Sequence, residues 1–224
     1  MMLSDVMEDY LKTIYHLQQD DERVRTSTIA DALEVTAPTV TSMVGKLEER
    51  GLVDREEYKG VSLTPEGETV ALEVVRHHRL LEAYLTEHLD YEWDEVHEEA
   101  DRLEHHISEA FERRVAAALD DPAVDPHGSP IPGADLEPIE TDQGDAISSF
   151  EPGDSVVVQQ VSDRDPEVLG YLAEHGVAPG ETLEIEEIAP FGMLTVATTD
   201  GRSVSLPEEV ATHIRVTHPA TVDS

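Results

Sequence analysis

The sequence contains no cysteine among its 224 residues. This absence excludes disulfide bonds, thiolate metal sites and cysteine nucleophiles. The chain also lacks an uninterrupted apolar run of about 18 residues, so it predicts no membrane-spanning helix. Its N-terminal segment is acidic and amphipathic, unlike a secretory signal. We therefore expect a cytoplasmic protein.

Lysine is almost absent, with only Lys12, Lys46 and Lys59, and the formal net charge is −35. Disorder is one interpretation of such a charge, but 39% of the residues are hydrophobic and periodic patterns run through most of the chain. A folded, acidic and lysine-poor protein resembles those of salt-loving organisms, and a halophilic archaeon is the expected source. In molar salt, repulsion between carboxylates is screened within about 3 Å. Carboxylates alone are therefore weak indicators of a site, and histidines carry more weight.

The first part of the chain predicts a winged helix-turn-helix domain over residues 1–64. The expected elements are helices over 4–19, 27–33 and about 38–50, followed by two short strands with a turn at Lys59-Gly60. Ser4 and Ser27 are the expected caps of the first two helices. Gly51 is expected to end the third helix in the left-handed conformation.

The rest of the chain predicts three further regions. Residues 65–120 form a helical domain, with a long helix to about His88 and another from about Asp94 to Leu119. Residues 121–142 are a Pro-rich structured loop or linker, since 121–140 alone holds five of the thirteen prolines. Residues 143–218 predict a small β-barrel-like domain of short strands with a helix near 165–175. The expected fold class is α+β.

The second helix of a helix-turn-helix pair normally lies in the DNA major groove. Here its exposed side carries small hydroxyls and a proline, which can bond phosphates and contact thymine methyl groups. Residues 1–60 hold 13 acidic and 7 basic side chains, so they are the least acidic part of the chain. A winged helix used only for protein contacts is the alternative. The expected DNA-facing residues are Thr36, Pro38, Thr39 and Ser42, with Lys46, Arg50, Arg55 and Lys59 near the phosphates.

Histidines are concentrated in the helical region, where six of the eleven fall between residues 77 and 106. His78 and Glu82 are four residues apart on one expected helix, so they share a face. In the stretch EVHEEADRLEHHISEAFERR, a continuous helix would place four further candidates on one side: His97, Asp101, Glu104 and His105. Carboxylate and imidazole ligands without sulfur suit first-row divalent metals. Ordinary acidic surface is the alternative for each residue taken alone.

Several stretches together resemble the diphtheria toxin repressor family of iron- and manganese-dependent transcriptional regulators. They are EDYLKTIYHL, APTVTSMVGKLEERGLV, LTPEGETVA, RHHRLLEAYL, EVHEEADRLEHHISEAFERR and DPHGSPIPG. The C-terminal part resembles the family's SH3-like third domain, which is also found in ferrous-transport accessory proteins. The resemblance implies that 65–120 is the metal-binding and dimerisation domain and that 143–218 is SH3-like. It also adds Ser27 to the DNA-facing residues.

The resemblance further implies two metal sites per chain. The regulatory site would use Asp9, Asp101, Glu104 and His105. The ancillary site would use His78, Glu82 and His97, completed by a third-domain side chain, for which Asp165 and Glu167 are the candidates.

The metal preference rests on two of these residues. Asp9 and Asp101 stand where the iron-dependent branch places Met and Cys, and hard oxygen ligands favour Mn²⁺. Lys12 stands where the manganese branch places a glutamate, which argues against a bridged dinuclear site. The manganese branch also lacks a histidine at the position of His97. The sequence therefore combines a manganese-type regulatory site with an iron-type, two-site layout.

The expected function is a homodimeric, metal-activated repressor that binds a palindromic operator and controls metal uptake. Mn²⁺ is the preferred corepressor and Fe²⁺ the alternative. A metal-dependent hydrolase is an alternative of another class, because such clusters also activate water. Against it stand the winged helix and the absence of an α/β pattern that would build a pocket. A metal-storage or chaperone module is a third alternative, and it predicts metal binding without any effect on DNA affinity.

Overall fold

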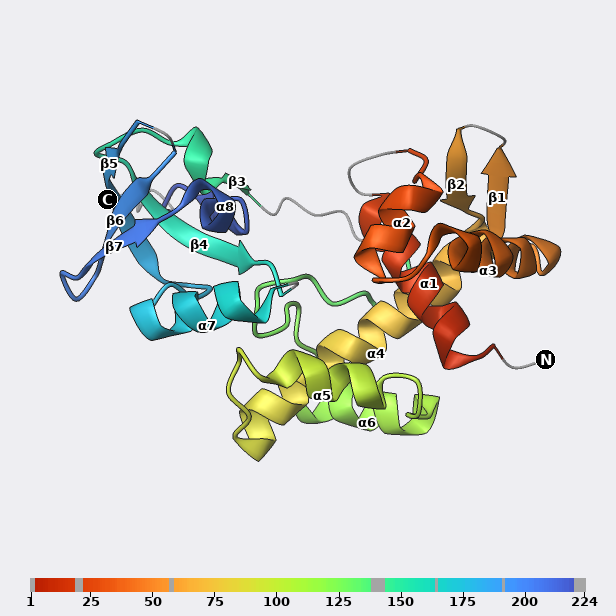
Figure 1. Ribbon diagram of the computed structural model, residues 1–224. Coiled ribbons are helices and arrows are strands. Elements are labelled where there is room, and N and C mark those ends of the chain that lie inside the picture. The colour runs from red at the N-terminus through yellow and green to blue at the C-terminus, as the bar shows by residue number, and fades with distance from the viewer. Residues whose placement is uncertain are drawn as a thin grey trace. The chain divides into compact units, whose positions relative to one another are not determined.

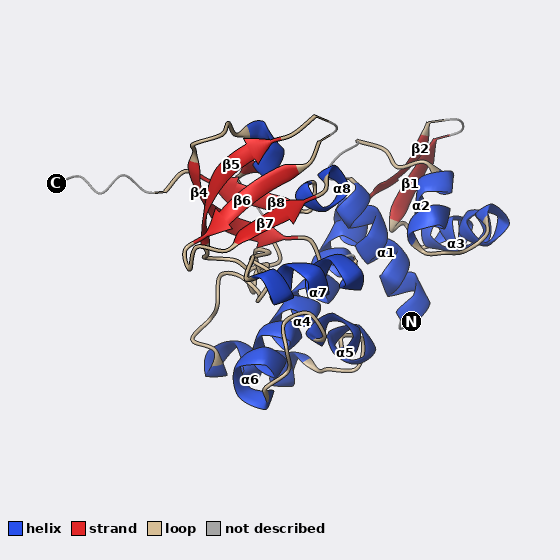
Figure 2. Cartoon of the chain, turned by 60° about the vertical axis from the view of Figure 1, so that its left-hand side comes forward, coloured by secondary structure: helices blue, strands red, loops and turns tan. Residues whose placement is uncertain are grey.

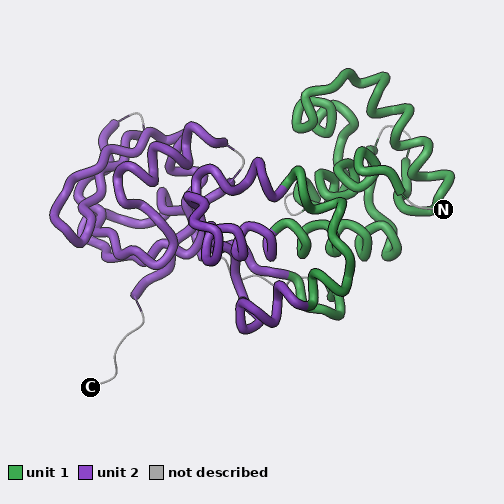
Figure 3. The backbone as a smooth tube through the Cα atoms, turned by 90° about the horizontal axis from the view of Figure 1, so that it is seen from below, with its two compact units in different colours: residues 1–78, 101–113, 132–139 green, residues 79–100, 114–131, 140–224 purple. Residues whose placement is uncertain are grey.

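The computed structural model describes residues 3–18, 22–56, 59–137, 144–163, 165–190 and 192–219, whose elements follow the order shown in Figure 1. Contacts divide the chain into two compact units (Figure 3). Unit 1 comprises 1–78, 101–113 and 132–139, and unit 2 comprises 79–100, 114–131 and 140–224. Helix α4 (Pro65–Leu89) contributes to both units, so the units do not follow the domain boundaries expected from the sequence. No helix among the described residues is long and apolar enough to span a membrane.

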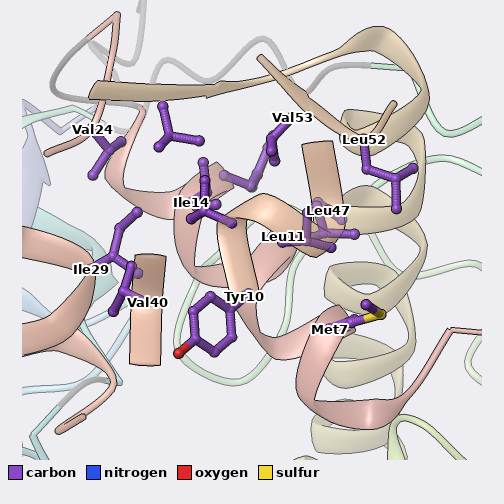
Figure 4. Packing of buried hydrophobic residues seen from close by; sticks show 14 of the residues in the cluster. Met7, Tyr10, Leu11, Ile14, Val24, Ile29, Val40, Leu47, Leu52 and Val53 are labelled. Carbon is purple, nitrogen blue, oxygen red and sulfur yellow. The ribbon is translucent and has the colours of Figure 1, made fainter. Parts of the chain in front are cut away.

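Unit 1 contains the expected winged helix-turn-helix. Its elements are α1 (Asp5–Leu17), α2 (Thr26–Ala32), α3 (Ala37–Glu49) and the antiparallel strands β1 (Val53–Glu56) and β2 (Gly60–Leu63). Figure 4 shows apolar side chains of these elements gathered into one core. The fully buried members include Leu11, Ile14, Ile29, Val40, Val44 and Leu47. Burial of these side chains, each contributing about 1.5–3 kcal/mol, holds α3 in one core with α1 and α2.

The ends of these helices follow the sequence expectation only in part. Gly51 has φ +72°, which confirms the left-handed end of α3. The expectation that Ser27 caps α2 is wrong, because the helix begins at Thr26 and Arg25 occupies the cap position. Ser4 does occupy the cap of α1, but its backbone carbonyl, not its hydroxyl, accepts from the Met7 N–H.

The prediction of a single helix from about 94 to 119 is wrong. The structure has two shorter helices, α5 (Val96–Leu103) and α6 (Glu109–Ala118). The His106 N–H bonds to the Leu103 carbonyl and closes a turn, while Ser108 accepts from Phe111 N–H through both its carbonyl and its hydroxyl and starts α6. Serine favours helix starts because its side chain satisfies such N–H groups. Glu104 and His105 therefore lie in a turn and do not share one helical face with His97.

The strands of unit 2 were largely expected from the sequence. Five predicted strands are confirmed as β4 (Ser155–Val161), β5 (Thr182–Ile188), β6 (Leu194–Thr198), β7 (Ser203–Leu206) and β8 (Ile214–Thr217). The helix near 165–175 is α7 (Pro166–His175). Three short elements were not expected: β3 (Asp145–Ala146), a 3-10 turn (Ile147–Ser149) and α8 (Glu208–Ala211). The sheet, drawn red in Figure 2, has the order β3-β8-β4-β5-β6-β7 and covers an apolar core.

Part of the Pro-rich segment is packed within unit 2. Ile131 lies in a small core with Leu80 of α4 and Val115 of α6. The Val161 N–H of β4 donates to the His127 carbonyl at 2.9 Å. Gly128 has φ +83° and lies so close to the Gln159 carbonyl that a Cβ atom would overlap it. The loop at 125–129 is therefore fixed against β4, whereas 138–142 of the expected linker lie outside the described residues.

Candidate metal centres and DNA interface

A cluster of three potential metal ligands lies in unit 1, which we call the Asp9 cluster. Asp9 comes from α1, and Glu104 and His105 come from the turn after α5. One ligand atom from each of the three lies within 4.8 Å of the others. His105 Nε2 is 2.8 Å from Asp9 Oδ1 and 3.4 Å from Glu104 Oε1. The cluster thus brings α1 to the turn after α5, and the metal-binding role that the resemblance implies for these residues stays a prediction.

The charges of this cluster favour a cation. Burial lowers the pKa of His105, but the Glu8 carboxylate bonded to its Nδ1, with Glu104 and Asp9, more than reverses this and raises it. Burial raises the pKa of Asp9, against the opposing effect of His105. The imidazole ring thus lies among three carboxylates, and a proton on it compensates their charge. A divalent ion bound to the imidazole would displace that proton, because a metal-ligating imidazole must be neutral. The charge of the ion would then compensate the carboxylates instead.

A second group in unit 1 surrounds Lys12, and we call it the Lys12 cluster. The Lys12 ammonium donates to Asp101 Oδ1 at 2.9 Å and to Glu104 Oε2 at 2.8 Å, and it lies 3.1 Å from His78 Nδ1. His78 Nδ1 is in turn 2.6 Å from Glu104 Oε2. Burial lowers the pKa of Lys12, but the charges of Glu104 and Asp101 outweigh it and raise the pKa above its usual value. The group is a charged network with a cation inside it.

The structure divides the predicted regulatory set between these two clusters. Asp9, Glu104 and His105 lie together, while Asp101 lies with Lys12 and His78. Glu104 belongs to both groups. His78, which the sequence assigned to the ancillary site, bonds to Glu104 within unit 1. It also precedes Glu82, the next predicted ancillary ligand, by one turn of α4.

Unit 2 holds two of the predicted ancillary residues. His97 Nδ1 of α5 lies 3.1 Å from Glu82 Oε1 of α4. The third-domain residue beside them is Asp163, whose Oδ2 is 3.7 Å from His97 Nδ1. Neither expected candidate is brought to this group. Asp165 caps α7 by accepting from the N–H groups of Glu167 and Val168, and Glu167 itself is exposed.

Two further residues complete what we call the Glu82 cluster, and sequence reasoning gave neither a role. Ligand atoms of Glu82, Asp125 and His127 lie within 4.8 Å of one another, and all three side chains are buried. The Trp93 carbonyl lies 2.6 Å from His127 Nε2, which leaves Nδ1 facing Glu82 Oε2 at 3.5 Å. Asp125 Oδ1 accepts from the N–H groups of His127 and Ser129.

The remaining atoms of these side chains fit a metal ion. Among the described residues, buried Asp125 Oδ2 and His127 Nδ1 have no hydrogen bond, and their ion-pair contacts with Arg79 Nε and Glu82 Oε2 are both 3.5 Å long. Such atoms are rare in folded proteins and call for an explanation. A metal-bound histidine typically donates its other ring N–H to a carbonyl, which is the arrangement of His127 and Trp93. A divalent ion facing Glu82 would therefore satisfy both atoms.

The electrostatics of the Glu82 cluster are strongly perturbed. Burial, followed by the charge of Glu82, raises the pKa of Asp125 to about 7. Burial alone would lower the pKa of His127, but Glu82 and then Asp125 raise it to about 9. Both shifts favour the protonated forms of Asp125 and His127 in the metal-free protein. The sequence signal that could have indicated this cluster is His127, which lies between two prolines and is followed by a glycine. Such a segment is not helical, so the histidine is not explained by packing on a helical face.

All nine residues predicted to face DNA are exposed: Ser27, Thr36, Pro38, Thr39, Ser42, Lys46, Arg50, Arg55 and Lys59. They come from α2, α3 and the β1-β2 hairpin or its borders. The Thr36 and Thr39 hydroxyls are 2.8 Å apart at the start of α3. Val40, Val44 and Leu47 occupy the opposite, buried face of that helix. Their roles in DNA binding stay predictions.

Comparison with known families matches almost the whole chain. Residues 2–61 match the iron-dependent repressor N-terminal DNA-binding domain, and 64–133 match the iron-dependent repressor metal-binding and dimerisation domain. Residues 146–218 match the FeoA domain.

Individual proteins agree with these matches. The chain is 34% identical to the iron-dependent repressor IdeR of Mycobacterium tuberculosis, over 96% of this chain and 97% of that protein. It is 35% identical to the diphtheria toxin repressor of Corynebacterium glutamicum, over 96% of each. Among solved structures, a manganese-dependent transcriptional repressor in complex with manganese has a TM-score of 0.87 and 39% identity, covering 95% of this chain and all of that one. The manganese regulator SloR has a TM-score of 0.80 and 34% identity, over 95% and 98%.

Proposed function

Since the chain belongs to the iron-dependent repressor family and is a metal-dependent transcriptional repressor, we propose that Mn²⁺ is its corepressor and that the Asp9 cluster is its regulatory site. The observation that carries this proposal is the meeting of Asp9, from α1, with Glu104 and His105. Asp101, the fourth predicted ligand, lies beside Glu104 and is bonded to Lys12. All four are oxygen or nitrogen donors, and a set without sulfur favours Mn²⁺ over softer ions.

The ligand arrangement defines how metal could control DNA binding. An ion held by Asp9 on one side and by Glu104 and His105 on the other would fix α1, whose buried face packs in the core that carries α3 (Figure 4). In a homodimer, this would set the spacing of the two recognition helices to match a palindromic operator. The ion shifts the equilibrium only by its preference for that arrangement. In the metal-free protein, α1 is already attached to α5 and the turn after it, because Lys12 of α1 donates hydrogen bonds to Asp101 and Glu104.

We assign a second metal ion to the Glu82 cluster. Glu82, His97 and Asp163 supply oxygen and imidazole donors, and buried Asp125 and His127 form a second group of potential ligands that shares Glu82. His78 precedes Glu82 by one turn of α4 and is the remaining predicted ligand. Because Asp163 follows β4 while Glu82 and His97 come from helices, an ion here would tie the sheet of unit 2 to those helices. We assign this site a structural role and assign control of DNA binding to the Asp9 cluster.

The experiment is a DNA-binding titration in high salt, performed without oxygen. A random-sequence DNA library is first selected with Mn²⁺-loaded protein, and the affinity for the selected DNA is then measured with Mn²⁺, with Fe²⁺ and with chelator. We expect Mn²⁺ to raise DNA affinity about 10–100-fold, the usual range of such coupling. Asp9→Ala and His105→Ala should lose that response while retaining the fold. Asp5→Ala, an exposed carboxylate on the same helix, is the matched control.

Three outcomes would overturn parts of this proposal. A full Mn²⁺ response in Asp9→Ala and His105→Ala would remove the site assignment. An equal response to Fe²⁺ and Mn²⁺ would remove the metal preference. Metal binding without any change in DNA affinity would favour a metal-storage module instead.

A further inference from the structure

The Lys12 ammonium occupies a position with the surroundings of a bound metal ion. Four atoms that could bind a metal ion lie within 3.1 Å of Nζ: Asp101 Oδ1, Glu104 Oε1, Glu104 Oε2 and His78 Nδ1. The three residues that supply them form a potential metal-ligand group by themselves. The Lys12 side chain is 15% exposed and that of Glu104 is 1% exposed, so the ammonium lies inside the protein.

Glu104 joins this ammonium to the Asp9 cluster. Both of its oxygens contact Lys12, at 2.8 and 3.1 Å, and its Oε1 is also 3.4 Å from His105 Nε2. Unit 1 therefore contains two adjoining positions for a positive charge, which share one carboxylate. The position at Asp9 and His105 has no lysine or arginine ion pair among the described residues, whereas the position at His78 and Asp101 contains an ammonium.

We propose that Lys12 is a resident cation that fills the second of these positions and limits the regulatory centre to one metal ion. This inference rests on the proposed regulatory role of the Asp9 cluster. The ammonium neutralises Asp101 and Glu104 and holds them in place for the ion that binds next to them. The Glu104 carboxylate is buried and the Asp101 carboxylate is half exposed, so loss of the ammonium would leave a buried carboxylate without its ion-pair partner, which is strongly unfavourable.

The donors around Lys12 indicate what happens when the ammonium is removed. One imidazole nitrogen and two carboxylates are ligands that first-row divalent ions accept. In Lys12→Met the side chain keeps most of its length and loses its charge. The vacated position should then take a second divalent ion that shares Glu104 with the first. Lys12→Arg keeps a cation there and should exclude that ion.

The test counts the Mn²⁺ ions bound per full-length chain by equilibrium dialysis and elemental analysis. Lys12→Met should bind one ion more than the wild type, while Lys12→Arg and the wild type should bind equal numbers. Arg113→Met is the matched control, because it removes one exposed positive charge from unit 1 and should leave the count unchanged. Electron paramagnetic resonance of Lys12→Met should show two spin-coupled Mn²⁺ ions. An unchanged count in a folded Lys12→Met protein would overturn the inference.

A measurement on the wild type covers the case in which Lys12→Met does not fold. The chain has only three lysines, so reductive methylation followed by mass spectrometry reports on each one. Exposed Lys46 and Lys59 should react, while Lys12 should stay unmodified both with chelator and with Mn²⁺. A Lys12 that becomes reactive on Mn²⁺ addition is displaced by the metal, and that result contradicts a resident cation. Loss of the Mn²⁺ effect on wild-type DNA binding would instead contradict the proposed function, so the two failures are separable.

Discussion

The two candidate metal centres differ in what compensates their carboxylates. In unit 1, Lys12 makes short contacts with Asp101 and Glu104, so part of the negative charge is balanced without any metal. In unit 2, Arg79 Nε lies 3.5 Å from Asp125 Oδ2 of the Glu82 cluster, a longer contact than those of Lys12. Protons on Asp125 and His127 supply the rest, as the raised pKa values of both groups indicate.

This difference indicates different roles for metal in the two units. The Lys12 network holds α1 and the turn after α5 together before metal arrives, so an ion there adds to an existing structure and can exchange. The Glu82 cluster leaves two buried polar atoms without hydrogen-bond partners among the described residues. We expect metal binding at the Glu82 cluster to raise the free energy of unfolding directly, because the ion replaces the protons that reduce repulsion between the carboxylates of Glu82 and Asp125.

The largest expected effect comes from removing the charge of Glu104. Glu104→Gln leaves the buried Lys12 ammonium with only Asp101 as a carboxylate partner, and breaking a buried ion pair typically costs about 3–5 kcal/mol. Thermal unfolding in the presence of chelator should show this loss. Glu82→Gln should lose little stability under the same conditions, because it also relieves the repulsion that raises the pKa of Asp125. With Mn²⁺ present, Glu82→Gln should fall well below the wild type.

The control for this pair is Glu109→Gln, an exposed carboxylate in an i, i+4 pair with Arg113. Such pairs contribute about 0.3–0.5 kcal/mol, so the variant should resemble the wild type. If Glu104→Gln is as stable as this control in chelator, the network around Lys12 does not stabilise unit 1. The distinction between the two centres would then be lost.

The second expected effect concerns pH: stability in chelator and the stabilisation by Mn²⁺ should change in opposite directions as the pH rises. The pKa of Asp125 is raised to about 7 and that of His127 to about 9, so the folded metal-free protein binds more protons than the unfolded chain between about pH 4 and 9. Stability in chelator should therefore fall as pH rises through this range. Mn²⁺ must displace the same protons, so the stabilisation by Mn²⁺ should grow as pH rises.

Thermal unfolding of the wild type and of Asp125→Asn, in chelator and in Mn²⁺, measures these opposite changes. Asparagine does not titrate, so the variant should lose the part of the slope between about pH 4 and 7. A wild-type stability in chelator that rises across this range would contradict the charge state assigned to the Glu82 cluster.

The elements that sequence reasoning predicted correctly are those specified by local patterns. The apolar periodicity of α3 and the five strands β4 to β8 could be predicted because each buries a regular set of side chains. The break between α5 and α6 could not, because helical periodicity continues on both sides of it. The break moves Glu104 and His105 off the helix, and there the turn brings them to Asp9. The helical spacing expected for these residues is therefore wrong, and their role as metal ligands stays a prediction.

The residues that the sequence missed depend on tertiary packing. Asp125 and His127 become buried because the loop around Gly128 packs on β4, at Gln159. No local pattern reports such a contact. Tertiary packing also brings Asp163, rather than the predicted candidates Asp165 and Glu167, beside His97: Asp165 precedes a proline at a helix start, where its carboxylate accepts from backbone N–H groups.

The smallest expected effects separate these two aspartates. Asp165→Ala removes a side-chain helix cap and should cost about 1 kcal/mol of stability, with Mn²⁺ affinity unchanged. Asp163→Ala should leave the metal-free stability nearly unchanged and weaken Mn²⁺ binding at the Glu82 cluster by ~10-fold or more, since even outer partners of metal ligands contribute about 10–100-fold. Calorimetric Mn²⁺ titration measures the metal affinity of both variants, and thermal unfolding in chelator measures their metal-free stability. If Asp165→Ala is the variant that loses metal, the start of α7 supplies the ligand, not the residue after β4. Asp163 would then have no part in the difference between a structural metal in unit 2 and an exchangeable one in unit 1.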